Sequence, residues 1–297
     1  MTLPDDLTFC IGLGAQRAGT TWLATYFAQH PSIFMSPIKE LHYFDALWRP
    51  DLMGRRSLAY LEELQELVAG LDLEEVRDRS DRWRHTQQLA RRLDMVGGGH
   101  EAYLEYFSSQ VGEEAVAAEI TPSYSVLDAG HLREIRSLHR RVKVIYIMRN
   151  PIDRVWSLLR HRERKGGFKL DRDFDATITS PGVMERSDYA HTLAALDAAF
   201  PPEDVFIGFY ERLFNETSIR SLCRFLGIPH EPAPLQTRVA KARERPITAE
   251  QRRRIGELLQ PVYDHCRARF GDRLPERWNA DIAFLEQAGR GTGDRPS

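Results

Sequence analysis

The stretch "TFCIGLGAQRAGTTWLATYFAQ", residues 8–29, decides the fold. It begins with a short apolar run, continues into a loop framed by Gly14 and Gly19, and then shows apolar residues at helical spacing from Thr20 onward. A buried strand, a glycine loop and a helix in this order bring backbone amides and the positive end of the helix together. The sequence therefore predicts an anion-binding site at the loop.

The chemistry of this loop differs from that of an ATP-binding loop. Gly14 and Gly19 are spaced as in a nucleotide-binding P-loop, but Thr20 stands where that motif has its lysine. Arg17 inside the loop supplies a cation instead, and Thr20 and Thr21 add hydroxyl donors. A turn in which glycine merely closes the bend is the alternative, but the coincidence of Arg17 with two threonines favours an anion.

Four further apolar runs follow, at residues 32–36, 115–120, 143–148 and 204–209. Continuous apolar runs of this length are typical of strands buried on both faces. Segments with helical periodicity lie between and after them, at residues 20–29, 57–69, 100–110, 131–139, 151–163, 186–199, 211–226 and 248–270. The alternation predicts a three-layer α/β fold, a mainly parallel sheet with helices on both faces.

Bulk composition limits the partners. The 297 residues carry 41 Lys plus Arg against 43 Asp plus Glu, so no overall field attracts nucleic acid or an anionic membrane. The three cysteines lack the spacing of a zinc site or a disulfide framework, and we expect no metal. The acidic N-terminal stretch and the absence of a long apolar run lead us to expect a cytoplasmic protein without a membrane span. The sequence does not indicate an oligomeric state.

We expect one domain over residues 1–297. Residues 71–94 are highly charged, and we interpret them as a solvated helix on an insertion of about 50–98. Residues 228–247 are rich in proline and basic side chains and predict a long loop, and we expect a frayed C-terminal tail at about 288–297.

A second basic position follows the strand predicted at 143–148. An ATP-dependent enzyme needs an acid at such a strand end to help hold Mg²⁺, whereas this strand ends in Arg149, followed by "NPIDRVWS". Neutralisation of Asp153 is the alternative role for Arg149. The two basic loops together indicate a ligand with two separated anionic groups.

These two segments resemble the sulfotransferases that use 3′-phosphoadenosine 5′-phosphosulfate (PAPS). "GAQRAGTTWL", residues 14–23, is similar to their 5′-phosphosulfate loop, and "RNPIDRVWSLLRH", residues 149–161, to their 3′-phosphate motif. The resemblance implies a P-loop NTPase-like sulfotransferase fold and a 3′-phosphate contact by Arg149 and Ser157. It further implies binding of the 5′-phosphosulfate by Arg17, Ala18, Gly19, Thr20, Thr21 and Trp22. Lys241, Arg243 and Arg245 are candidates for closing over the cofactor.

"PIKELHYFD", residues 37–45, resembles the branch that contains heparan sulfate sulfotransferases and many bacterial relatives. The resemblance implies that Glu40 is the catalytic base and that His42 and Asp45 line the acceptor site. His42 is the alternative base, because its ordinary pKa is closer to neutral, and an ion pair with Lys39 or Arg149 is the alternative role for Glu40. In "AEITPSYS", residues 118–125, Ile120 stands where the family often has lysine.

The expected function is sulfuryl transfer from PAPS to a hydroxyl or amine of a carbohydrate or small-molecule acceptor. A magnesium-dependent P-loop kinase is one alternative, against which Thr20 and Arg149 argue. A non-catalytic nucleotide-binding module is the other, suggested by Ile120 and by Arg17 where the family commonly has lysine.

Overall fold

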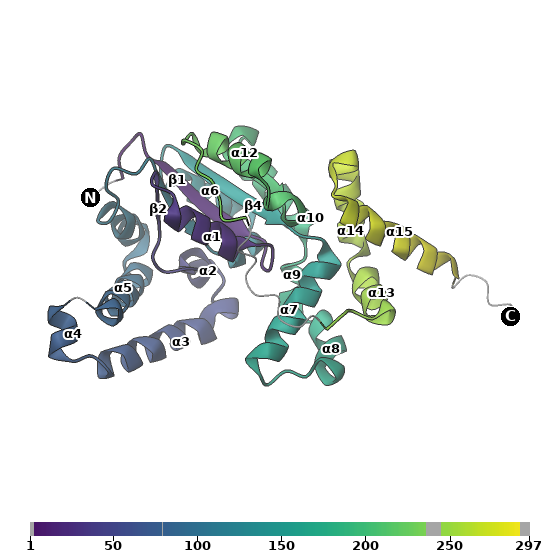
Figure 1. Cartoon of the computed structure of the whole chain (residues 1–297), viewed down its shortest axis with the longest axis horizontal. Coiled ribbons are helices and arrows are strands. Elements are labelled where there is room, and N and C mark those ends of the chain that lie inside the picture. Colours follow the sequence, from purple (N-terminus) through teal and green to yellow (C-terminus); the bar gives the residue numbers. More distant parts are fainter. Residues whose placement is uncertain (1–2, 79, 236–244, 292–297) are drawn as a thin grey trace.

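The computed structural model describes residues 3–78, 80–235 and 245–291 of the chain. Its centre is a parallel sheet of five strands in the order β2-β3-β1-β4-β5 (Figure 1). The strands are β1 (Thr8–Gly14), β2 (Ile33–Met35), β3 (Val116–Ile120), β4 (Val142–Met148) and β5 (Val205–Phe209). All five predicted strands and the predicted α/β fold are confirmed.

The sheet topology positions the functional loops. β1 lies in the middle and pairs in parallel with β3 on one side and β4 on the other. Every residue of β1 and β3 is buried, as their apolar sequences require. Because the carboxyl ends of parallel strands meet at one edge, the loops after β1, β3 and β4 gather there, where ligands of such sheets bind.

The helices that connect the strands agree largely with the sequence. α1 (Thr20–Gln29), α6 (Ala129–Ser137), α7 (Pro151–Lys165) and α10 (Tyr189–Ala199) were expected, whereas α8 (Leu170–Ile178) and α9 (Pro181–Glu185) were not. The helix expected at 211–226 is divided into α11 (Tyr210–Leu213) and α12 (Glu216–Leu226). The break occurs because Asn215 caps α12, its side chain accepting from the Ser218 amide at 2.9 Å.

The charged insertion contains α3 (Pro50–Ala69), α4 (Leu73–Arg77) and α5 (Asp81–Ser108), on the side of the sheet that carries β2 (Figure 1). α5 continues past residue 98, where the insertion was expected to end, and includes most of the helix expected at 100–110, with a kink at Gly99, where φ is 71°. Leu89, Arg92 and Met95 are each 1% exposed. The expectation of a solvated helix is therefore wrong for this face of α5, which packs on the core.

The C-terminal region is more divided than expected. The helix predicted at 248–270 is two helices, α13 (Ala249–Leu258) and α14 (Gln260–Phe270), and α15 (Glu276–Gly291) follows them. They lie beside α7 and α10, at the opposite side of the sheet from the insertion (Figure 1). The expectation of a frayed tail is wrong for residues 288–291, which continue α15.

The remaining short elements are α2 (Tyr43–Trp48) and the 3₁₀ helices η1 (Pro122–Val126), η2 (Pro202–Asp204) and η3 (Gly271–Arg273). Cys10, Cys223 and Cys266 are free and buried. Of the described helices, none combines the length and apolar character needed to cross a membrane.

Candidate functional site

The anion loop, residues 14–19, connects β1 to α1 and follows a compact path. Three of its residues have positive φ, 138° at Gly14, 69° at Arg17 and 86° at Gly19. A Cβ on Gly19 would lie only 3.1 Å from side-chain atoms of Leu213 and Tyr210, so glycine is required there.

α1 begins directly after this loop. The amides of Thr20, Thr21 and Trp22 form its first turn, where backbone donors have no acceptor within the helix. These donors and the positive end of the helix make the loop suitable for an anion.

The structure brings the two predicted basic positions together. Arg17 Nε donates a hydrogen bond to Ser157 Oγ on α7 at 3.2 Å. Arg149 Nη1 donates to the carbonyl oxygen of Arg17 at 2.9 Å, and its guanidinium carbon lies 4.3 Å from the centre of the Tyr210 ring. The Nε of Arg149 is buried and has no hydrogen-bond partner among the described residues. The loops after β1 and β4 therefore form one continuous basic surface.

We call Arg17, Arg149, Arg160 and Arg164 the cation cluster. Burial lowers the pKa of Arg17, and the positive charges of Arg149, Arg164 and Arg160 lower that pKa further. Within the described part of the chain, neither Arg17 nor Arg149 forms an ion pair with a carboxylate. Repulsion between Arg17 and Arg149 is unfavourable unless an anion lies beside them.

Asp153, the alternative partner considered for Arg149, pairs with another residue. Arg277 Nε and Nη2 each donate to the Asp153 carboxylate at 2.8 Å. Neutralisation of Asp153 therefore does not account for the position of Arg149.

Other predicted cofactor residues have different surroundings. The Ala18 amide donates to the Ala15 carbonyl at 3.1 Å, so it is engaged within the anion loop. The Trp22 indole is 5% exposed and donates to the Pro234 carbonyl at 3.3 Å, which leaves only its backbone amide for a ligand.

Of the three basic residues expected to close over a cofactor, the structure describes one. Arg245 forms ion pairs with Asp171 at 2.6 Å and Glu163 at 3.5 Å. Lys241 and Arg243 lie outside the described residues.

The base turn, residues 39–45, leads from β2 into α2 and contains the predicted acceptor-site residues. Glu40 Oε2 lies 3.4 Å from His42 Nε2, and His42 Nδ1 lies 2.7 Å from Asp45 Oδ2. The His42 and Asp45 side chains are 1% and 0% exposed, whereas that of Glu40 is 23% exposed. The three side chains form an ordered chain that ends at Glu40, the member that solvent or an acceptor reaches most easily.

Lys39 connects the base turn to the first turn of α1, which follows the anion loop, a role that the sequence did not reveal. Its Nζ donates to Thr21 Oγ1 at 2.7 Å and lies 3.4 Å from Glu40 Oε1. The ion pair considered for Glu40 thus exists, but it is part of the site. The position of Lys39 beside Glu40 in the motif was the available signal.

The buried carboxyl group of Glu119 supports the base turn through Tyr124. Glu119 on β3 accepts hydrogen bonds from the hydroxyls of Tyr103, Thr121 and Tyr124, and burial raises its pKa to about 7. Tyr124 Oη in turn accepts from the Tyr43 amide at 3.0 Å.

Ile120 follows Glu119 on β3 and is fully buried. Its side-chain atoms lie 2.8 Å from where a Cβ on Gly12 would stand, so it packs between strands and supplies no polar group to the site.

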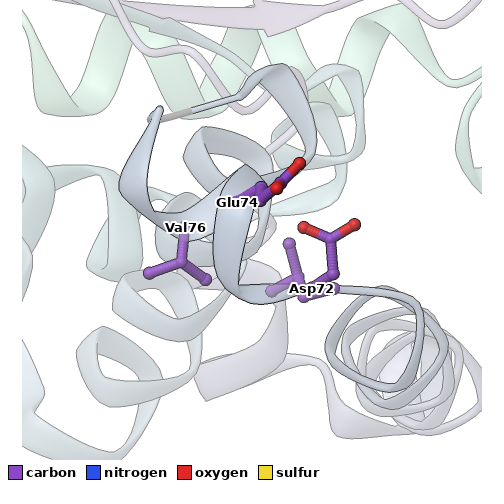
Figure 2. A pocket seen from close by; sticks show the side chains of 4 residues that line it. Asp72, Glu74 and Val76 are labelled. Carbon is purple, nitrogen blue, oxygen red and sulfur yellow. The ribbon is translucent and has the colours of Figure 1, made fainter.

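A hollow of about 580 Å³ lies away from these residues, at α4, and is lined by Leu71, Asp72, Glu74 and Val76 (Figure 2). No predicted site residue lines it, and its two carboxylates would repel an anion, so we place the site by contacts and charge instead. Among the described residues, no group of three or more His, Cys, Asp or Glu side chains is placed to hold a metal ion.

Comparison with known proteins identifies the family and the fold. The model of the sulfotransferase family matches residues 10–232. A sulfotransferase from Alicyclobacillus acidocaldarius has a similar structure, with a TM-score of 0.60 and 20% identity over 94% of this chain and 100% of its own. A sulfotransferase domain from the curacin biosynthetic pathway gives a TM-score of 0.49 at 19% identity over 84% of this chain and 82% of its own. A mouse sulfotransferase complexed with PAP gives 0.47 at 13% identity over 95% and 90%. No curated protein matches the chain.

Proposed function

The chain belongs to the sulfotransferase family, and we propose that it transfers a sulfuryl group from PAPS to a hydroxyl or amine of a carbohydrate or small-molecule acceptor. The observation that carries this proposal is the cation cluster at the ends of β1 and β4. It joins Arg17 and Arg149 through a 2.9 Å hydrogen bond, and neither has a carboxylate partner among the described residues. A nucleotide with two separated anionic groups has the charge and the shape to occupy it.

The two ends of the cluster suit the two ends of PAPS. The 5′-phosphosulfate would be held by three kinds of group: the backbone amides in the first turn of α1, the hydroxyls of Thr20 and Thr21, and the guanidinium of Arg17. Arg149 and Ser157 would hold the 3′-phosphate, which ATP lacks. When bound, PAPS supplies the activated sulfuryl group.

Glu40 is our choice of base. In the reaction the acceptor O–H (or N–H) bond breaks, a bond from that atom to sulfur forms, and the bond between sulfur and the bridging oxygen breaks to leave PAP. Glu40 takes the acceptor proton. The Glu40 side chain is 23% exposed and that of His42 only 1%, which favours Glu40 as the base. His42 would instead orient Glu40, and Asp45 would orient His42.

Two cations assist this chemistry. Lys39 lies 3.4 Å from Glu40, and its hydrogen bond to Thr21 links the base to the first turn of α1. Arg17 would stabilise the negative charge that develops on the departing phosphate.

The two alternatives fit less well. A magnesium-dependent kinase needs an acidic metal ligand where β4 ends, and Arg149 occupies that position. A non-catalytic module has no need of the ordered chain from Asp45 through His42 to Glu40.

Calorimetric titration tests the proposal. We expect PAP to bind in the presence of EDTA, and magnesium-ATP to bind at least about a hundredfold more weakly, because it lacks the 3′-phosphate. Turnover of PAPS against an acceptor panel then tests transfer. Preference for magnesium-ATP over PAP would contradict the proposal.

A further inference from the structure

The backbone of the base turn is strained at the proposed base. Glu40 has φ of 61° and His42 has φ of 52°, a region that residues with a side chain rarely adopt. No glycine occurs in residues 39–45 to relieve this conformation. Such a turn persists only where its surroundings hold it.

Two side chains of the insertion hold the carbonyl groups of this turn. Arg92 Nε on α5 donates to the Leu41 carbonyl oxygen at 2.8 Å. Tyr60 Oη on α3 donates to the Glu40 carbonyl oxygen at 3.0 Å. The Arg92 guanidinium carbon lies 3.8 Å from the centre of the Tyr60 ring, so the two donors brace one another.

The core holds the amide side of the same turn. The Tyr43 amide donates to Tyr124 Oη at 3.0 Å, and the His42 amide approaches Thr121 Oγ1 at 3.5 Å. The turn is therefore fixed from two directions, by the sheet through its amides and by the insertion through its carbonyls.

The burial of Arg92 requires an explanation. It is 1% exposed on the face of α5 that packs on the core, and burying a guanidinium is costly unless it makes specific contacts. Arg92 donates to the Leu41 carbonyl, and its guanidinium lies over the Tyr60 ring. Both contacts serve the base turn.

We propose that Arg92 and Tyr60 are positioning residues for Glu40, and that the insertion is therefore part of the catalytic apparatus. This inference rests on the proposed function of Glu40 as base. A shift of about 1 Å in a catalytic group costs on the order of a hundredfold in rate. Arg92 and Tyr60 donate to carbonyl groups of the base turn, whereas Arg17 and Arg149 lie on the loops after β1 and β4, so we expect cofactor binding to be independent of Arg92 and Tyr60.

Four variants test the proposal. Arg92→Met removes the donor and the charge, Arg92→Lys keeps a cation over the ring, and Tyr60→Phe removes only the hydroxyl. Arg91→Met is the matched control, because Arg91 is the exposed neighbour of Arg92 on α5.

We expect Arg92→Met to lower kcat about tenfold to a hundredfold, with the KM for PAPS and the Kd for PAP within about twofold of wild type. Tyr60→Phe should show a smaller loss of the same kind, Arg92→Lys should recover part of the rate, and Arg91→Met should match wild type. Unchanged kcat in both Arg92→Met and Tyr60→Phe would overturn the proposal. Should Arg92→Met fail to fold, Tyr60→Phe, which leaves the ring in place, decides.

Amide hydrogen exchange gives a readout that needs no activity. In Tyr60→Phe and Arg92→Met, the amides of His42 and Tyr43 should exchange faster, while those of β1 and β4 keep the wild-type rate. The wild type could also fail to bind PAP and to transfer sulfuryl groups while both variants still show faster exchange. In that case the proposed function fails, and Arg92 and Tyr60 hold the base turn for a structural reason only. If the His42 and Tyr43 amides of both variants exchange at the wild-type rate, Arg92 and Tyr60 do not hold the base turn, and the proposal is refuted.

Discussion

The cation cluster and the base turn lie at the same end of the sheet, but their electrostatics are opposite. In the cation cluster, Arg17 and Arg149 have no carboxylate partner among the described residues, and their charges repel. In the base turn, each charged group has a neighbour of complementary character, from Asp45 through His42 and Glu40 to Lys39.

This difference separates binding from chemistry. Arg17 and Arg149 have no carboxylate partner in the described part of the chain, so an anion that binds there relieves the repulsion between them. The base turn is complete without a ligand, so its geometry is set before the reaction begins. Variants of the two regions should therefore fail in different ways.

Glu40→Gln should produce the largest effect. The amide keeps the shape of the side chain but does not accept a proton, so we expect kcat to fall about 10²- to 10⁴-fold. The Kd for PAP should change by no more than about twofold, because Glu40 lies outside the cation cluster. Single-turnover kinetics and calorimetry measure the two quantities on the same preparation.

His42→Gln serves as the comparison for this variant. A smaller loss of kcat than in Glu40→Gln supports the assignment of His42 as a positioning residue. A larger loss, with Glu40→Gln close to wild type, would make His42 the base.

Glu119→Gln should change stability by up to about 3 kcal/mol, in a manner that depends on pH. Burial raises the pKa of Glu119 from 4.5 to about 7 in the folded protein. Between these values the folded state holds more protons than the unfolded state, so the free energy of unfolding falls as pH rises. A shift of this size corresponds to about 3 kcal/mol.

The measurement is urea unfolding from about pH 5 to about pH 8. Wild type should lose stability over this window relative to Glu119→Gln, whose neutral amide does not titrate. Parallel profiles would show that Glu119 does not carry the raised pKa, and the buried support of the base turn would then need another explanation.

The sequence predicted the sheet and the anion loop well because both depend on local pattern. Each strand is a continuous apolar run, and the glycine loop directly follows one of them. The error at residues 248–270 had a local signal, because Pro261 lies in the first turn of α14 and indicates a new helix start. The sequence contains a weaker local signal for α15, because this helix is held by tertiary contacts such as the ion pair between Arg277 and Asp153.

The base turn could be predicted only in part. The motif at 37–45 located Glu40, His42 and Asp45, but the contacts that hold them join residues far apart in the chain. Lys39 and Thr21 are 18 positions apart, and Arg92 and Leu41 are 51 apart. A charged segment gives no local indication that one of its arginines faces inward, which is why the sequence predicts a solvated helix at residues 71–94.

Arg149→Ala should have a smaller effect than either carboxylate variant, and it sharpens the contrast between the two regions. We expect the Kd for PAP to rise about tenfold to a hundredfold, the value of charge-assisted bonds to a phosphate. The free protein should be little destabilised, because the loss of the bond to the Arg17 carbonyl and of the contact with Tyr210 is offset by relief of repulsion in the cluster. Added salt should weaken PAP binding less in this variant than in wild type, since fewer charges meet the ligand.

Arg140→Met is the control, because the Arg140 side chain is 75% exposed and pairs with Asp5, away from the site. A variant with wild-type affinity for PAP but a marked loss of stability would reverse the comparison, making Arg149 a structural residue.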